Sequence, residues 1–226
     1  MYLGVWYNFL MATINEKEYE NIRNLYQERR LSMQEISEIY KVPLDAIVYF
    51  FKRHKIPRRN RTESNRILFE RKATAFKVKE KLSAHEEKLR IAGVMLYWAE
   101  GSNALTADKV DFVNSNPEMI MLFMQFLRKI CRIDETKLRV LLYCYANQNK
   151  EYLKDFWSSV TNIPITKFTK PYVREDYKPE KEGRMKYGLI HIRYYEKKLL
   201  LLLWKWRKEI AKELGVDTKV VKWTRL

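Results

Sequence analysis

The chain has 226 residues, with 44 lysines and arginines against 28 aspartates and glutamates, and its formal net charge is +16. An excess of this size costs self-repulsion and commonly indicates a polyanionic partner such as nucleic acid. The only cysteines, Cys131 and Cys144, form no CxxC pair, which argues against a disulfide scaffold and against a zinc site of the usual spacing. Buried thiols in a reducing cytoplasm are the simpler interpretation.

Two apolar runs, at residues 1–10 and 199–204, are too short to span a bilayer, so we expect a cytoplasmic protein without a membrane segment. The first run is either an extra strand or sequence upstream of a start at Met11.

Residues from about 15 to 56 have the pattern of three short helices. The second begins at Ser32 with Glu35 three residues later, a capping box, and Pro43 suits the first turn of the third. The residues that we expect to be buried are Ile22, Leu25, Tyr26, Ile36, Ile39, Tyr40, Ile47, Phe50 and Phe51. Residues 31–59 therefore resemble the helix-turn-helix of recombinases and transposases, although a bundle that contacts only protein has the same pattern.

Basic residues cluster immediately after these helices. From Lys52 to Arg90 there are 14 lysines and arginines against five acids, 14 − 5 = +9 in 39 residues. We expect DNA contacts from Lys52, Arg53, Arg58, Arg59 and Arg61, although solvated surface charge is the simpler explanation for any single residue. The segment 62–82 is basic and lacks proline and glycine, and a thin apolar stripe (Leu68, Ala75, Val78, Leu82) predicts a connecting helix. The predicted organisation is a helix-turn-helix domain at 1–61, this connecting helix at 62–82, and a larger domain at 83–226.

The larger domain opens with a second capping box, Ser83 with Glu86, and an apolar helix that ends at Gly101. Strands are then predicted at 109–113, 137–145, 166–172 and 187–194, and helices at 117–131, 150–160 and 195–214. This order predicts an α+β fold with a mostly antiparallel sheet and helices on one face.

Two of the strands alternate with a period of two, which buries one face and leaves a basic and aromatic face. Solvent could cover that face, but the same mixture on two strands favours DNA, because β-strands can reach base edges in the major groove. The DNA contacts expected here are Lys137, Arg139, Tyr143, Lys186, His191 and Arg193.

The segment Gly93–Gly101 (GVMLYWAEG) resembles a divergent LAGLIDADG motif, with Leu96, Ala99, Glu100 and Gly101 at matching positions. The family's central glycine falls on Met95. The stretch from Asp111 to Glu118 is similar to the branch of this family that has EGS after the motif. The resemblance covers about residues 83–214 and implies the family's saddle-shaped sheet.

The resemblance to LAGLIDADG homing endonucleases also implies chemistry. Two motif helices pack side by side, and each supplies an acid that holds Mg²⁺ (or Mn²⁺) at a scissile phosphate of double-stranded DNA. Glu100 is that acid, catalytic and metal-binding. Because the chain has one motif, the resemblance implies a homodimer joined through Ala92, Gly93, Leu96 and Ala99.

Three functions fit these patterns. The first is a Mg²⁺-dependent DNA endonuclease. The second is a DNA-binding transcriptional regulator that uses the same scaffold without cleavage. The third is an RNA-splicing maturase. The retained acid Glu100 favours the endonuclease.

Overall fold

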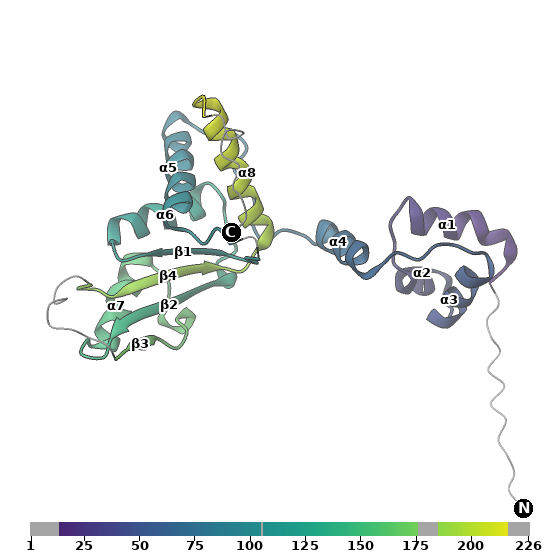
Figure 1. Ribbon diagram of the computed structural model, residues 1–226, viewed down its shortest axis with the longest axis horizontal. Coiled ribbons are helices and arrows are strands. Elements are labelled where there is room, and N and C mark those ends of the chain that lie inside the picture. The colour runs from purple at the N-terminus through teal and green to yellow at the C-terminus, as the bar shows by residue number, and fades with distance from the viewer. Residues whose placement is uncertain (1–13, 105, 176–184, 217–226) are drawn as a thin grey trace, which may run out of the picture. The chain divides into compact units, whose positions relative to one another are not determined.

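A computed structural model describes residues 14–104, 106–175 and 185–216, and it divides the chain into two compact units at Ala73–Thr74. The two are labelled by element in Figure 1. Within these ranges the fold is α+β, as predicted, with eight α-helices and one four-stranded sheet. No helix in the described ranges is long and apolar enough to cross a membrane. The apolar run at 1–10 lies outside the described residues.

The first unit consists of helices, in agreement with the sequence. A 3-10 turn at Glu16–Glu18 precedes α1 (Tyr19–Gln27), α2 (Met33–Tyr40), α3 (Leu44–Arg53) and α4 (Arg61–Arg71). The turn between α2 and α3 is Lys41-Val42-Pro43. Lys41 has a left-handed backbone with φ of 52°, and Val42 N–H donates to the Ser37 carbonyl at 3.0 Å.

The core of the first unit lies between α1, α2 and α3. The buried residues are Ile22, Tyr26, Ile36, Ile47, Phe50, Phe51 and Ile56. Ile39, predicted to be buried, is 56% exposed. The reason is that α2 packs through Met33, Ile36 and Tyr40, with Ser37 also buried, so Ile39 lies outside the packed face.

The predicted connecting helix over 62–82 is wrong beyond Arg71, where α4 ends. The following segment is extended and belongs to the second unit. Phe76 forms an antiparallel bridge with Ile133, and Lys79 N–H donates to the Ile130 carbonyl at 2.9 Å. Phe76 and Val78 pack against the core of the second unit, and their spacing of two residues suits an extended chain better than a helix.

Both predicted capping boxes are present, and in each the capping glutamate also forms an ion pair with a basic side chain. Glu35 accepts from Ser32 N–H at 2.8 Å and pairs with Arg71 of α4 at 2.7 Å. Glu86 accepts from Ser83 N–H at 3.0 Å and pairs with Lys79. The Arg71 side chain and the Ser32 amide lower the pKa of Glu35 to about 2, and the Lys79 side chain and the Ser83 amide lower the pKa of Glu86 to about 2.

The second unit is a four-stranded sheet packed against helices. Its elements are α5 (Ala84–Glu100), β1 (Val110–Asn114), α6 (Pro117–Lys129), a 3-10 turn (Glu135–Lys137), β2 (Leu138–Tyr145), α7 (Lys150–Thr161), a second 3-10 turn (Ile165–Lys167), β3 (Tyr172–Arg174), β4 (Leu189–Tyr194) and α8 (Lys197–Glu213). The strand order is β1-β4-β2-β3, antiparallel except for the parallel pair β2–β3.

The strand predicted at 166–172 begins only at Tyr172. Before it, the chain touches β2 at one point, where Thr169 N–H donates to the Val140 carbonyl at 2.8 Å. Pro171 has no amide hydrogen to continue this pairing. The edge strand β3 is therefore only three residues long.

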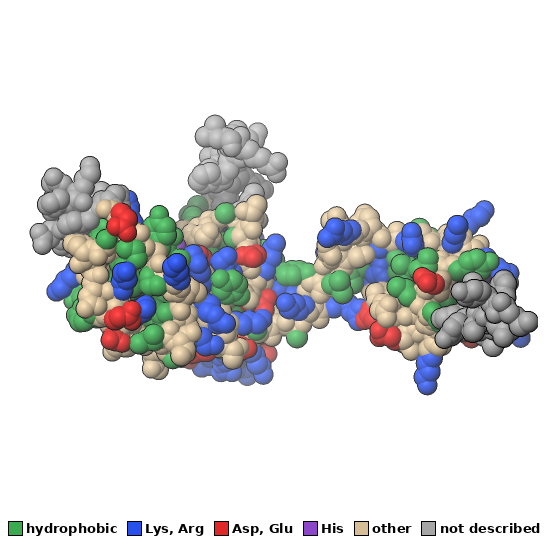
Figure 2. Space-filling model, turned by 90° about the horizontal axis from the view of Figure 1, so that it is seen from below, with side chains coloured by type: hydrophobic (Ala, Val, Ile, Leu, Met, Phe, Trp, Pro, Cys, Tyr) green, Lys and Arg blue, Asp and Glu red, His purple; other side chains and the backbone are tan. Residues whose placement is uncertain are grey.

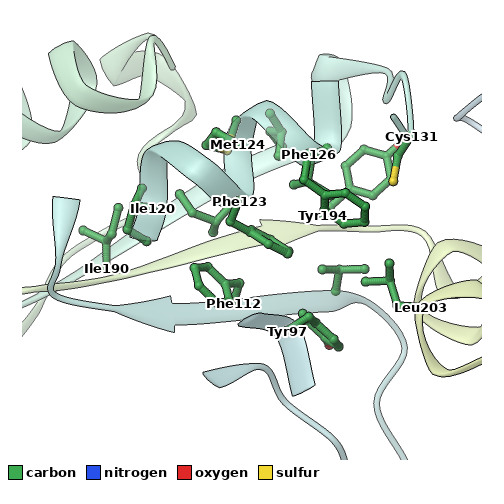
Figure 3. Packing of buried hydrophobic residues seen from close by; sticks show 14 of the residues in the cluster. Tyr97, Phe112, Ile120, Phe123, Met124, Phe126, Cys131, Ile190, Tyr194 and Leu203 are labelled. Carbon is green, nitrogen blue, oxygen red and sulfur yellow. The ribbon is translucent and has the colours of Figure 1, made fainter. Parts of the chain in front are cut away.

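The core between the sheet and the helices is mainly aliphatic and contains a group of aromatic side chains, which Figure 3 shows around Phe112, Phe123 and Phe126. The rings of Phe112 and Phe123 stack at 4.1 Å. Helix α5 reaches α6 closely because position 93 is glycine: a Cβ there would lie 2.1 Å from Cγ of Phe126.

We therefore expect Gly93→Ala to destabilise the second unit by about 1–3 kcal/mol, the usual cost of overpacking a core, despite alanine's better helix propensity. Urea unfolding measures the change. In the double variant Gly93→Ala with Phe126→Leu, the loss should be smaller than the sum of the two single losses, because the shorter side chain makes room. Strict additivity would contradict the assigned contact.

Candidate nucleic-acid interface

The sheet of the second unit has one buried and one polar face, as the alternation predicts. The buried face contributes Leu138, Val140, Leu142, Ile190 and Ile192 to the core. We define the polar face by Asp111, Arg139, Leu141, Tyr143, His191 and Arg193, all partly exposed. Tyr145, the last residue of β2, is only 7% exposed, and the Arg174 guanidinium lies 5.9 Å from its ring centroid.

A continuous chain of contacts crosses all four strands on the polar face. The Tyr143 ring lies 4.7 Å from that of Tyr172 and stacks on His191 at 4.8 Å. The carboxylate of Asp111 is 2.8 Å from His191 Nδ1 and accepts from Arg193 Nε at 3.0 Å. We call these five residues the sheet-face network. It joins β3, β2, β4 and β1 into one polar and aromatic surface.

Asp111 lies at the centre of the charged part of this network. Its side chain is 14% exposed. Burial raises the pKa of Asp111, but the hydrogen bonds and charges of His191 and Arg193 outweigh it, so the pKa is lowered overall. Asp111 was not among the predicted site residues. The available signal was an acid at the partly exposed position between Val110 and Phe112, which are both buried.

Lysine and arginine side chains outnumber acidic ones on the side of the second unit shown in Figure 2. Besides His191 and Arg193, two further predicted DNA contacts have intramolecular partners. Lys137 Nζ is 3.1 Å from Glu196, a buried carboxylate that also caps α8. Arg139 Nη1 donates to the carbonyls of Thr136 and Leu138 at 2.8 and 2.6 Å. Lys186 is exposed beside Tyr187.

Helix α5 ends at Glu100, and the chain then joins the edge of the sheet. Gly101 N–H donates to the Tyr97 carbonyl at 2.8 Å, and Gly101 forms an antiparallel bridge with Phe112. Ser102 N–H donates to the Asp111 carbonyl at 2.9 Å, and Tyr97 Oη donates to the Ser102 carbonyl at 2.9 Å. Position 101 requires glycine because a Cβ there would lie 2.4 Å from the Tyr97 carbonyl.

Glu100 is exposed, and its side chain has no hydrogen-bond or ion-pair partner within the described residues. A carboxylate at a helix C-terminus opposes the helix dipole, so folding stability does not explain it. The described ranges contain no group of three or more His, Cys, Asp or Glu side chains that could hold a metal ion alone. A single free carboxylate nevertheless suits Mg²⁺, which commonly takes one or two protein carboxylates together with substrate phosphates and water.

In the first unit, four of the predicted contacts are exposed: Lys52, Arg53, Arg58 and Arg61. Arg53 also pairs with Glu16. Sequence reasoning missed Tyr49, which is 58% exposed on α3 one turn from Lys52. Tyr49 was outside the expected core of Ile47, Phe50 and Phe51, and its place beside Lys52 on the outward side of α3 was the available signal.

Arg59 was predicted to contact DNA, but the structure engages it within the first unit. Its guanidinium donates to the carbonyls of Arg30, at 3.1 Å, and of Leu31. It also lies 3.9 Å from the centroid of the Tyr26 ring, and its amide donates to Tyr26 Oη at 2.8 Å. Arg59 therefore holds the loop between α1 and α2, and its contact with a DNA phosphate stays a prediction.

The four residues predicted at the dimer seam differ in their accessibility. Ala99 is exposed, whereas Ala92 and Leu96 are partly buried. Gly93 is buried against Phe126 of the same chain, and its place at an intermolecular seam stays a prediction. Its lack of a side chain serves α5–α6 packing.

Comparison of the chain with models of protein families, with curated proteins and with solved structures finds no match.

The contacts of Arg59 give a test of its structural role. Arg59→Ala removes two charged hydrogen bonds and a cation–π contact, and should lower the stability of the first unit by about 2–4 kcal/mol. Arg58→Ala, one residue away and exposed, should change it by less than about 0.5 kcal/mol. Hydrogen exchange of the α1 amides measures both variants. Equal protection of the α1 amides in the two variants would contradict the structural role of Arg59.

Proposed function

We propose that the protein is a site-specific DNA endonuclease of the LAGLIDADG homing type, which hydrolyses phosphodiester bonds in duplex DNA as a homodimer with Mg²⁺ or Mn²⁺. The observation that carries the proposal is the connection between Glu100 and the polar sheet face. Gly101 and Ser102 bond directly to Phe112 and Asp111 of β1, so the free acid is held at the edge of the sheet that carries the sheet-face network.

Two surfaces support DNA binding. The first is α3, whose accessible residues include Tyr49, Lys52 and Arg53, and which follows a three-residue turn typical of helix-turn-helix domains. The second is the polar face of the sheet, with tyrosines and basic residues on adjacent strands. A β-surface of this composition can follow the major groove, and the net charge of +16 favours association with the phosphate backbone.

The proposed cleavage centre uses Glu100 from each of two copies, because one chain supplies one such acid and duplex cleavage requires chemistry on both strands. Glu100 would hold the divalent ion, which would supply Lewis-acid chemistry for phosphodiester hydrolysis. The chain itself contributes a fixed position for Glu100, since Tyr97 and Gly101 fasten the end of α5 to β1.

The proposed dimer surface lies on α5 and α8. Large apolar side chains there are exposed, namely Ile91 (37%), Trp98 (41%) and Leu201 (40%). Ala99 is exposed beside Trp98 and the free acid.

Ala99→Trp should therefore convert the dimer into monomers, because a bulky side chain separates helices that approach through a small residue. Sedimentation velocity at micromolar concentration measures the change. Ser159→Trp, the same addition on an exposed turn of α7, should leave the dimer intact. A wild-type chain that is monomeric with and without DNA would contradict the proposed dimer.

Glu100→Gln tests the enzymatic proposal because it keeps the shape and removes the charge. On a duplex selected for tight binding, it should abolish Mg²⁺-dependent cleavage. Affinity in metal-free buffer should be equal or slightly higher, and the melting temperature equal or higher, because the charge opposes the helix dipole and repels phosphates. Glu80→Gln, which removes an exposed acid elsewhere in the second unit, is the matched control and should cleave normally.

A second candidate is a DNA-binding regulator without hydrolytic activity. It is favoured by the isolation of Glu100, which belongs to no acidic group within the described ranges. The same assay separates the two functions: a regulator binds the selected duplex but does not cleave it at any Mg²⁺ or Mn²⁺ concentration.

A further inference from the structure

Asp111 connects the two polar residues of β4 that point to the same side of the sheet. His191 and Arg193 are alternate residues on β4, and Asp111 is the residue of β1 directly opposite Arg193. One carboxylate oxygen contacts His191 Nδ1 at 2.8 Å, and the other accepts from Arg193 Nε at 3.0 Å. Each oxygen thus holds one side chain.

The geometry at Arg193 leaves the outer edge of its guanidinium available. Asp111 takes the Nε–H, and within the described residues Nη1 and Nη2 have no hydrogen-bond partner. Two parallel N–H donors on a planar fork match the O6 and N7 acceptors of guanine in the major groove. Fixing the fork through Nε before binding reduces the side-chain entropy that recognition would otherwise cost.

His191 is held in a similar way. Because the Asp111 carboxylate is an acceptor, His191 Nδ1 carries the proton of this hydrogen bond, and the ring stacks on Tyr143 at 4.8 Å. Ring and guanidinium are therefore fixed by a single acid, with side chains only 15% and 22% exposed.

An acid on a face that approaches DNA repels phosphate, so Asp111 weakens non-specific binding. The alternative of a purely structural ion pair does not explain the Nε-only contact, which leaves the forked edge of the guanidinium unused.

From these contacts we infer that Asp111 is a specificity-determining residue: it positions Arg193 to read one guanine in each half of a duplex DNA site. The inference depends on the proposed DNA binding and assigns a base to one position of the site.

The test is selection from a randomised duplex library by the full-length protein in metal-free buffer. The wild type should select a guanine at one position of each half-site. Arg193→Lys, which keeps the charge but loses the fork, should reduce this preference about tenfold, within the range for a bidentate contact. Asp111→Asn should reduce it similarly, while affinity for arbitrary duplexes is equal or higher. Asp155→Asn removes the same charge from an exposed site on α7 and should keep the preference.

The double variant, Asp111→Asn with Arg193→Lys, separates positioning from independent effects. If Asp111 acts through Arg193, the double variant should resemble Arg193→Lys alone. Additive losses, or an unchanged preference in Asp111→Asn, would overturn the inference. A melting temperature lowered by Asp111→Asn together with equal losses on every sequence would also overturn it, in favour of a structural role.

Failure of the proposed function gives a different result. A wild-type protein that binds no duplex contradicts DNA binding itself. A wild type that selects a sequence in which no guanine depends on Arg193 contradicts only the role of Asp111.

Discussion

The contact between Gly101 and Tyr97 determines where the apolar helix α5 stops and where the sheet begins. The Tyr97 carbonyl accepts from Gly101 N–H at 2.8 Å, and the Tyr97 hydroxyl reaches over to the Ser102 carbonyl at 2.9 Å. Tyr97 is 2% exposed, and burial raises its pKa to about 12, so the hydroxyl stays protonated as a donor. Ser102 N–H then donates to the Asp111 carbonyl. The end of α5 at Glu100 is therefore hydrogen-bonded, through the next two residues, to the strand that carries Asp111.

Much of the fold was predictable because its signals are local. The capping boxes at Ser32 and Ser83, and the period-two alternation of β2 and β4, specify helices and strands within a few residues. The prediction of a connecting helix failed beyond Arg71 because the apolar stripe at helical spacing omitted Phe76. Phe76 forms an antiparallel β-bridge with Ile133. The shortened β3 depends on Pro171 and on its partner strand, which periodicity alone does not identify.

The site was less predictable, because the role of a charged residue depends on partners distant in sequence. Arg59 donates to the Arg30 carbonyl, 29 positions earlier, and Lys137 pairs with Glu196, 59 positions away. Asp111 contacts His191 across 80 positions. The positive charge of the sequence therefore includes residues that hold the fold together, and only the remainder is available to a polyanion.

The sheet-face network crosses strands that are paired over unequal lengths. Asp111, His191 and Arg193 lie on β1 and β4, which pair over five residues, and β4 pairs with β2 over six, whereas Tyr172 lies on an edge strand paired over only three. A short edge ladder opens locally at a lower free-energy cost than a central one, and its amides exchange with solvent sooner. The aromatic end of the network, at Tyr172, should therefore open before the charged end on β1 and β4.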